Sequence, residues 1–163
     1  MRGPRRRVPG QDLFASQLHD VGKVAIPDRI LDKPGTLSAE EWQTMQMHCA
    51  LGANILGQNT SPYVAMATEV AHAHHERWDG TGYPRGLAGE EIPLAARIVM
   101  LADTYDVLRG RRAYKDALDH SAAASAILVG DARTKPEHFD PQLLGAFKSS
   151  LGEFRDIFET LRG

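Results

Sequence analysis

The stretch HAHHERWDGTGYP, residues 72–84, holds more reactive side chains than any other part of the sequence. The alanine-rich run before it, 64–73, predicts a helix, and Gly80 and Gly82 predict where that helix stops, because glycine adopts backbone angles that other residues avoid. Adjacent helical positions point about 100° apart, so we expect His74 and His75 to diverge, with room for each to bind a different metal ion. The alternative is a pair of partly buried structural histidines at a helix end.

Composition indicates a globular protein of one domain. The chain has 163 residues, of which 42% are hydrophobic and 25% charged, with a formal net charge of −2. This near-neutral balance predicts no DNA or RNA partner. Residues 1–12 hold four arginines among glycines and prolines, so we expect a disordered basic arm, with contact to nucleic acid or lipid as the alternative, followed by a folded domain over 13–163. No apolar run is long enough for a membrane span, and Cys49 is the only cysteine, so we expect a cytoplasmic protein.

Helical patterns dominate the chain, and no alternating run predicts a strand, so the expected fold class is all-α, a single compact helical bundle. Ser38 and Glu41 form a capping-box pattern that opens a helix over 38–56 with an apolar stripe from Trp42 through Cys49. Residues 26–37 predict an ordered loop. Further helices are expected over about 13–22, 62–75, 93–108, 116–129, from 140 onward and over 154–161, the fifth of these opened by Asp140-Pro141.

Six residues on or beside these helices are typical metal ligands. Imidazoles and carboxylates together suit iron, manganese, zinc or nickel, and the lack of thiolates in the set argues against a structural zinc site. A carboxylate can bridge two metals, and two metals a few ångström apart would hold a phosphate and activate a water for attack. Alternatives for single members are a packed histidine at 48, and an Asp103 that caps a helix or pairs with Arg97 or Arg111. The candidate ligands are His19, Asp20, His48, His74, His75 and Asp103.

Seven motifs resemble those of the HD-GYP domain, a branch of the HD phosphohydrolases that hydrolyses the bacterial messenger cyclic di-GMP. The resemblance extends from about residue 18 to 147 in matching order. The motifs are HDVGK (19–23), IPDRILDKPG (26–35), HHERWDGTGYPRGL (74–87), IPLAARI (92–98), ADTYD (102–106), RAYK (112–115) and HFDP (138–141).

The resemblance implies a role for each matching position. The six ligands would bind two divalent ions, most often Fe or Mn, with Asp20 bridging them, and Lys23 would stabilise charge at the scissile phosphate. Arg112 and Lys115 would bind the substrate's phosphates. The loop of Gly82, Tyr83 and Pro84 would shape the cleft and contact diguanylate cyclase (GGDEF) domains. Simpler alternatives are a cation at a helix end for Lys23, a solvated basic face for Arg112 and Lys115, and packing for Tyr83.

One feature departs from the family pattern. HD proteins normally have a helix before the HD pair that supplies another histidine, and residues 1–17 contain none. The chain is then a fragment or carries a misplaced start, or is a short protein with an incomplete site, or water or a partner chain fills the position. In the first two cases an exposed apolar face would favour a homodimer.

These observations predict a metal-dependent phosphodiesterase that converts cyclic di-GMP to linear pGpG, GMP or both, with Lys23 and Asp20 as catalytic residues. Two alternatives are a non-catalytic module that binds cyclic di-GMP or a GGDEF partner, and an HD phosphohydrolase acting on another nucleotide.

Overall fold

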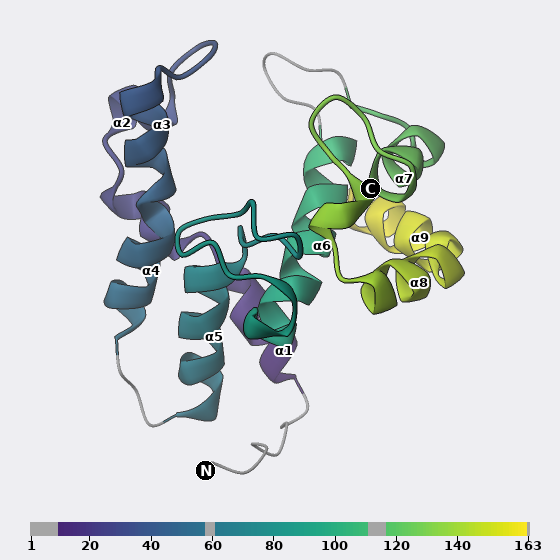
Figure 1. Ribbon diagram of the computed structural model, residues 1–163, viewed down its shortest axis with the longest axis horizontal. Coiled ribbons are helices and arrows are strands. Elements are labelled where there is room, and N and C mark those ends of the chain that lie inside the picture. The colour runs from purple at the N-terminus through teal and green to yellow at the C-terminus, as the bar shows by residue number, and fades with distance from the viewer. Residues whose placement is uncertain (1–9, 58–60, 111–116, 163) are drawn as a thin grey trace. The chain divides into compact units, whose positions relative to one another are not determined.

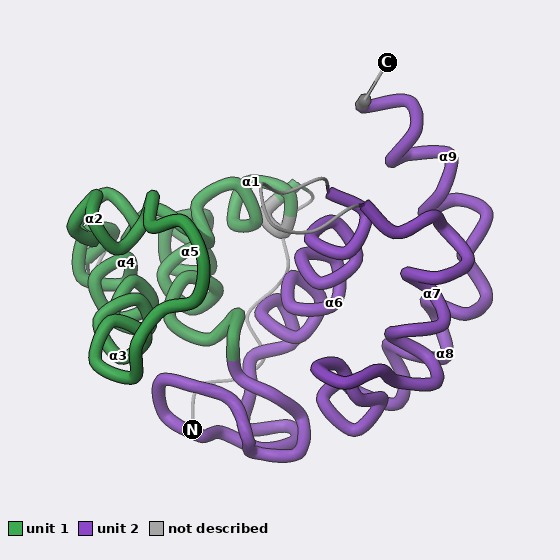
Figure 2. Tube along the Cα trace, turned by 90° about the horizontal axis from the view of Figure 1, so that it is seen from above, with its two compact units in different colours: residues 1–75 green, residues 76–163 purple. Residues whose placement is uncertain are grey.

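The structure, a computed structural model, describes residues 10–57, 61–110 and 117–162, and within these ranges it contains helices and no strand (Figure 1). The predicted all-α fold is therefore confirmed. The chain divides into two compact units, residues 1–75 and 76–163 (Figure 2). None of the described helices is long and apolar enough to cross a membrane.

The first unit is built on α5, which contacts both α1 and α4, while the 3₁₀ helix η1 packs against α4. Two glycines allow the close approach of η1 to α4. A Cβ atom on Gly22 would collide with the carbonyl oxygen of His48 and the amide nitrogen of Gly52. The segment that carries His19 and Asp20 can therefore reach α4 only because residue 22 has no side chain. The elements are α1 (Gln11–Gln17), η1 (Val21–Ala25), α2 (Asp28–Leu31), α3 (Ala39–Gln46), α4 (His48–Leu56) and α5 (Pro62–Ala73).

Four sequence expectations in this unit need correction. Helix α1 starts at Gln11, so the last two residues of the predicted arm are helical, and residues 1–9 lie outside the described part. The predicted loop 26–37 contains α2, a single turn that buries Ile30. The predicted helix 38–56 is two helices, because at Met47 the amide donates to the carbonyl three residues back and interrupts the α-helical pattern. Trp42, expected on the buried stripe, is 46% exposed. The capping box of Ser38 and Glu41 is confirmed.

The second unit has its core between α6, α7 and α8. Tyr105 of α6 lies at the centre, with Phe147 of α8 and Phe154 of α9 packed edge-on against its ring. Asp119 caps α7, which therefore starts later than the predicted 116, whereas Asp140 caps α8 as predicted. The elements are η2 (Gly89–Glu91), α6 (Leu94–Arg109), α7 (His120–Leu128), η3 (Pro136–His138), α8 (Pro141–Ser149) and α9 (Leu151–Arg162).

Candidate metal centre

The ends of helices in the first unit bring the predicted HD pair to three further histidines. His19 and Asp20 lie between α1 and η1, and His48 is the first residue of α4. His74 and His75 directly follow the last residue of α5. Because α5 packs on α1 and α4 while η1 packs on α4, these helix ends meet in one place.

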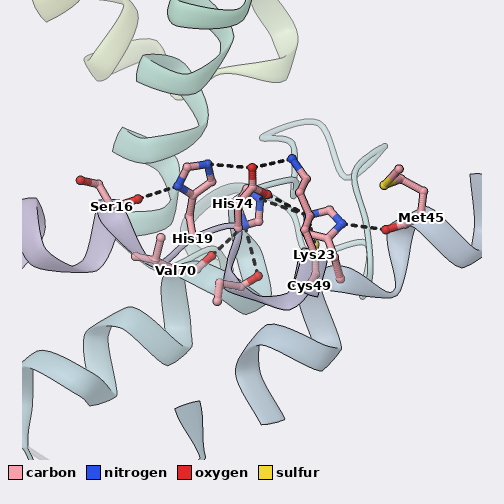
Figure 3. A network of polar contacts seen from close by, with 10 residues as sticks. Ser16, His19, Lys23, Met45, Cys49, Val70 and His74 are labelled. Carbon is pink, nitrogen blue, oxygen red and sulfur yellow. Dashed lines mark hydrogen bonds and ion pairs between the residues drawn. The ribbon is translucent and has the colours of Figure 1, made fainter. Parts of the chain in front are cut away.

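Backbone carbonyls fix the orientation of three of the rings. Nδ1 of His19 lies 2.5 Å from the carbonyl oxygen of Ser16, and Nδ1 of His48 lies 2.7 Å from that of Met45 (Figure 3). Nδ1 of His74 lies 3.1 Å from two carbonyl oxygens of the last turn of α5. A carbonyl oxygen only accepts hydrogen bonds, so each Nδ1 is the donor. In the neutral ring Nε2 then carries a lone pair, which is the arrangement found in metal-binding histidines.

These Nε2 lone pairs converge on the carboxylate of Asp20. Nε2 of His48 and Nε2 of His74 lie 3.4 Å apart. Asp20 Oδ1 lies 3.4 Å from the former and 3.7 Å from the latter, while Oδ2 lies 3.3 Å from Nε2 of His19. Oδ1 is buried and has no hydrogen-bond partner among the described residues. A buried carboxylate oxygen facing two lone pairs is electrostatically unfavourable unless a cation lies between them, so this donor set fits a metal ion.

The electrostatics of the site favour a metal ion over added protons. Burial lowers the pKa of the His48 imidazole, and the neighbouring His74 lowers it further. Burial, together with His74 and His48, lowers the pKa of His75 to about 2. Burial alone would raise the pKa of the Asp20 carboxyl, but the ammonium of Lys23, which donates a hydrogen bond to Oδ2, holds that pKa below its usual range. The site therefore presents neutral imidazoles at His48 and His75 and an ionised carboxylate at Asp20, the protonation states that bind metal.

Lys23 lies at the edge of this site. Its ammonium donates a hydrogen bond to Asp20 Oδ2 at 2.5 Å, three residues along the chain (Figure 3). The side chain of Lys23 is 39% exposed, so its charge is at the boundary between the buried ligands and solvent. A cation at this boundary can neutralise the negative charge of a phosphate bound at the site.

His74 and His75 differ from the sequence expectation, because their rings do not diverge. The ring centroids lie 4.1 Å apart. The helix ends at Ala73, with His74 as its C-cap, so the helical angle between successive residues does not apply to this pair. Two groups of potential ligands result, in each of which all ligand atoms lie within 4.8 Å of one another: His19, Asp20 and His74; and His48, Cys49, His74 and His75.

The remaining predicted site residues belong to the second unit or lie outside the described residues. Asp103 is a half-buried residue of α6, and its assignment to the metal centre stays a prediction. Arg112 and Lys115 lie outside the described residues.

The loop that contains Gly82, Tyr83 and Pro84, here called the GYP loop, is held in place by a buried glutamate, Glu76. This residue was not among the predicted site residues. Glu76 is 2% exposed, and its two carboxylate oxygens accept hydrogen bonds from the amides of Arg85 at 2.8 Å and Leu87 at 3.0 Å. A Cβ atom on Gly82 would collide with the backbone of Glu76 and Arg77, so the loop closes over its own start. Tyr83 is half-buried and Pro84 exposed, which leaves the loop surface open to contact.

The HFDP motif (138–141) also contacts the segment that leads into this loop. The carbonyl of His138 accepts a hydrogen bond from the amide of Trp78 at 2.8 Å. Asp140 caps α8 with Oδ1 and accepts a hydrogen bond from Arg97 with Oδ2 at 2.5 Å. The Arg97 guanidinium lies 5.5 Å from the centre of the Trp78 ring. Arg97, offered by the sequence as a partner for Asp103, is thus paired with Asp140.

Comparisons with known proteins agree with this geometry. The family model described as "HD domain" matches residues 6–143. A Vibrio cholerae protein named "Probable cyclic di-GMP phosphodiesterase" is 46% identical, over 88% of this chain and 33% of its own length. A Thermotoga maritima protein named "Cyclic di-GMP phosphodiesterase" is 41% identical, over 89% of this chain and 38% of its own. A second V. cholerae protein, "3'3'-cGAMP-specific phosphodiesterase 2", is 44% identical, over 90% of this chain and 27% of its own.

The helical fold and the histidine–aspartate site define the class, and the chain belongs to the HD-domain family. Within that family its HDVGK and HHERWDGTGYP motifs and its relatives are those of the HD-GYP type, as the sequence predicted. An HD domain implies a divalent metal, and the donor set around Asp20 fits one. The chain spans about a third of the length of the three relatives described.

Proposed function

We propose that this chain is a metal-dependent phosphodiesterase that hydrolyses cyclic di-GMP to linear pGpG, GMP or both. The observation that carries the proposal is the convergence of His Nε2 atoms on Asp20 Oδ1, a buried oxygen with no hydrogen-bond partner in the described part of the chain. The relatives named as cyclic dinucleotide phosphodiesterases support the reaction class.

Two divalent ions, Fe or Mn, would be held by His19, Asp20, His48, His74, His75 and Asp103. Such ions polarise the phosphoryl oxygens and activate the attacking water. The carbonyls of Ser16 and Met45 hold the His19 and His48 rings by Nδ1, which keeps each Nε2 unprotonated and directed at the centre. The backbone thus fixes the ligands before any ion binds, which lowers the entropic cost of assembling the site.

The chain's own cations would act on the substrate. Lys23 holds Asp20 ionised, and its partly exposed ammonium can add positive charge where the phosphate gains negative charge. Arg112 and Lys115 would bind the phosphate groups of the cyclic dinucleotide, because paired cations suit its two phosphodiesters.

The GYP loop would contact GGDEF domains through its exposed surface at Pro84 and Arg85. The hydrogen bonds to Glu76 hold the loop backbone in place, so a partner would bind an ordered loop.

We also infer a homodimer, because α3, α4 and the junction between them expose Trp42, Met47 and Ile55.

The proposal is tested by anaerobic turnover of cyclic di-GMP and of 3'3'-cGAMP by the purified chain loaded with Fe(II) or Mn(II). We expect linear product from cyclic di-GMP that chelator abolishes and that fresh metal restores. Faster turnover of 3'3'-cGAMP would revise the substrate but keep the reaction. Saturable nucleotide binding with no product under either metal would contradict the enzyme and favour a non-catalytic binding module.

A further inference from the structure

The single cysteine of the chain lies inside the candidate metal centre. Cys49 is fully buried and follows His48 in the first turn of α4. Its Sγ atom lies 3.5 Å from Nε2 of His48. With the ligand atoms of His48, His74 and His75 it forms a group in which all distances are within 4.8 Å. From the sequence this residue is expected on the apolar stripe, and the six candidate ligands include no thiolate.

The spacing of these atoms matches ligands of one ion. Nitrogen ligands at 2.0–2.1 Å and a sulfur ligand at 2.3 Å in tetrahedral arrangement lie about 3.4 Å apart for two nitrogens and about 3.6 Å apart for nitrogen and sulfur. The structure places Nε2 of His48 3.4 Å from Nε2 of His74 and 3.5 Å from Sγ of Cys49. Sγ therefore lies at the distance of a neighbouring ligand, closer than the roughly 4 Å of an ordinary apolar contact.

The orientation of His48 supports the same conclusion. Its Nδ1 is held by the carbonyl of Met45, so Nε2 is the nitrogen left for a metal, and this is the nitrogen that the sulfur approaches. Because the ring is 1% exposed, water has little access to the space between them.

We propose that Cys49 is a metal ligand that shares an ion with His48, an inference that rests on the proposed metal-dependent function. The other members of that ligand group are His74 and His75. The thiol loses its proton to solvent when the metal binds.

Cobalt is the direct probe, because a thiolate bound to Co(II) gives a near-ultraviolet charge-transfer band and the ion itself gives visible d–d bands. Anaerobic titration of the full chain with Co(II) is expected to produce both. Since the chain has one cysteine, the charge-transfer band reports Cys49 alone. Cys49→Ser is expected to keep the d–d bands, lose the charge-transfer band and bind Co(II) at least about tenfold more weakly.

Two histidine variants test whether Cys49 and His48 bind the same ion or whether the thiol binds cobalt without His48. His48→Ala is expected to lose the charge-transfer band, and His72→Ala, two residues before His74 and outside both ligand groups, to keep it. Visible bands without the near-ultraviolet band in the wild type would overturn the cysteine ligand while leaving the metal-dependent function intact. Absence of both bands would overturn this proposal and the metal centre together.

Discussion

Glu76 of the second unit is a buried carboxylate and Asp20 of the first unit has one buried oxygen, Oδ1, and the fold treats the two carboxylates differently. Both oxygens of Glu76 accept hydrogen bonds from amides of the loop that follows it. Oδ2 of Asp20 accepts a hydrogen bond from the ammonium of Lys23. Oδ1 is buried near the Nε2 atoms of His48 and His74 and has no hydrogen-bond donor among the described residues. A buried carboxylate destabilises a fold unless its charge is compensated. Glu76 is compensated by amides of its own unit, as a structural residue would be, whereas Oδ1 of Asp20 has no donor among the described residues, and we propose that a metal ion compensates it.

The first way to test this difference is to remove the charge of Asp20. Asp20→Asn keeps the shape of the side chain but removes the anionic ligand, so turnover of cyclic di-GMP is expected to fall at least about 100-fold. Initial rates under saturating Mn(II) measure the effect. The melting temperature of the metal-free chain should stay close to the wild-type value. Near wild-type turnover in this variant would remove Asp20 from the reaction.

The second test adds a Cβ atom at the two glycines that lie against backbone near the two carboxylates, Gly22 near Asp20 and Gly82 against Glu76. Gly22→Ala and Gly82→Ala place a Cβ atom against backbone that cannot move away easily, so each is expected to lower the free energy of unfolding by about 3 kcal/mol or more. Chemical denaturation measures both. Gly152→Ala is the matched control, because its Cβ meets nothing within 4 Å on α9, and it should stabilise by about 0.5–1 kcal/mol. Equal effects at all three positions would contradict the packing argument.

The third test applies the same amide substitution to the other carboxylate. Glu76→Gln replaces one acceptor oxygen by a donor that faces a backbone amide, so we expect a loss of about 1–3 kcal/mol in the free energy of unfolding. Metal content per folded chain should remain that of the wild type. A Glu76→Gln chain that is fully stable but loses metal would reverse the roles of the two carboxylates.

The smallest expected effect is a pH dependence in the second unit. Burial, with a contribution from Arg77, lowers the pKa of His138, whose Nδ1 accepts a hydrogen bond from the amide of Lys135. A histidine with a lowered folded pKa contributes stability above its unfolded pKa of about 6.5, and this stability is lost as pH falls through the folded value. The stability difference between wild type and His138→Gln should therefore shrink from pH 7.5 to 5.5. NMR titration that places the pKa above 6.5 would contradict this.

Local signals in the sequence predicted much of the fold and most of the first unit's site. The capping residues Ser38 and Asp140 act within three residues, and the HD and HHE motifs pointed directly to His19, His74 and His75, whereas His48 lies in neither motif. What failed depends on contacts between distant segments. Glu76 bonds amides 9 and 11 residues away, and Cys49 reaches the centre only because α4 starts at His48. The relative direction of the His74 and His75 rings depends on the residue at which α5 ends, and the sequence did not predict that end to within one residue.

The most direct measurement of the central claim is the number of Mn(II) ions that each chain retains after anaerobic equilibrium dialysis, determined by elemental analysis. We predict about two ions per wild-type chain and per Glu76→Gln chain, and fewer than one per Asp20→Asn chain. Equal retention by Asp20→Asn and wild type, or no retention by either, would contradict a metal centre built on Asp20.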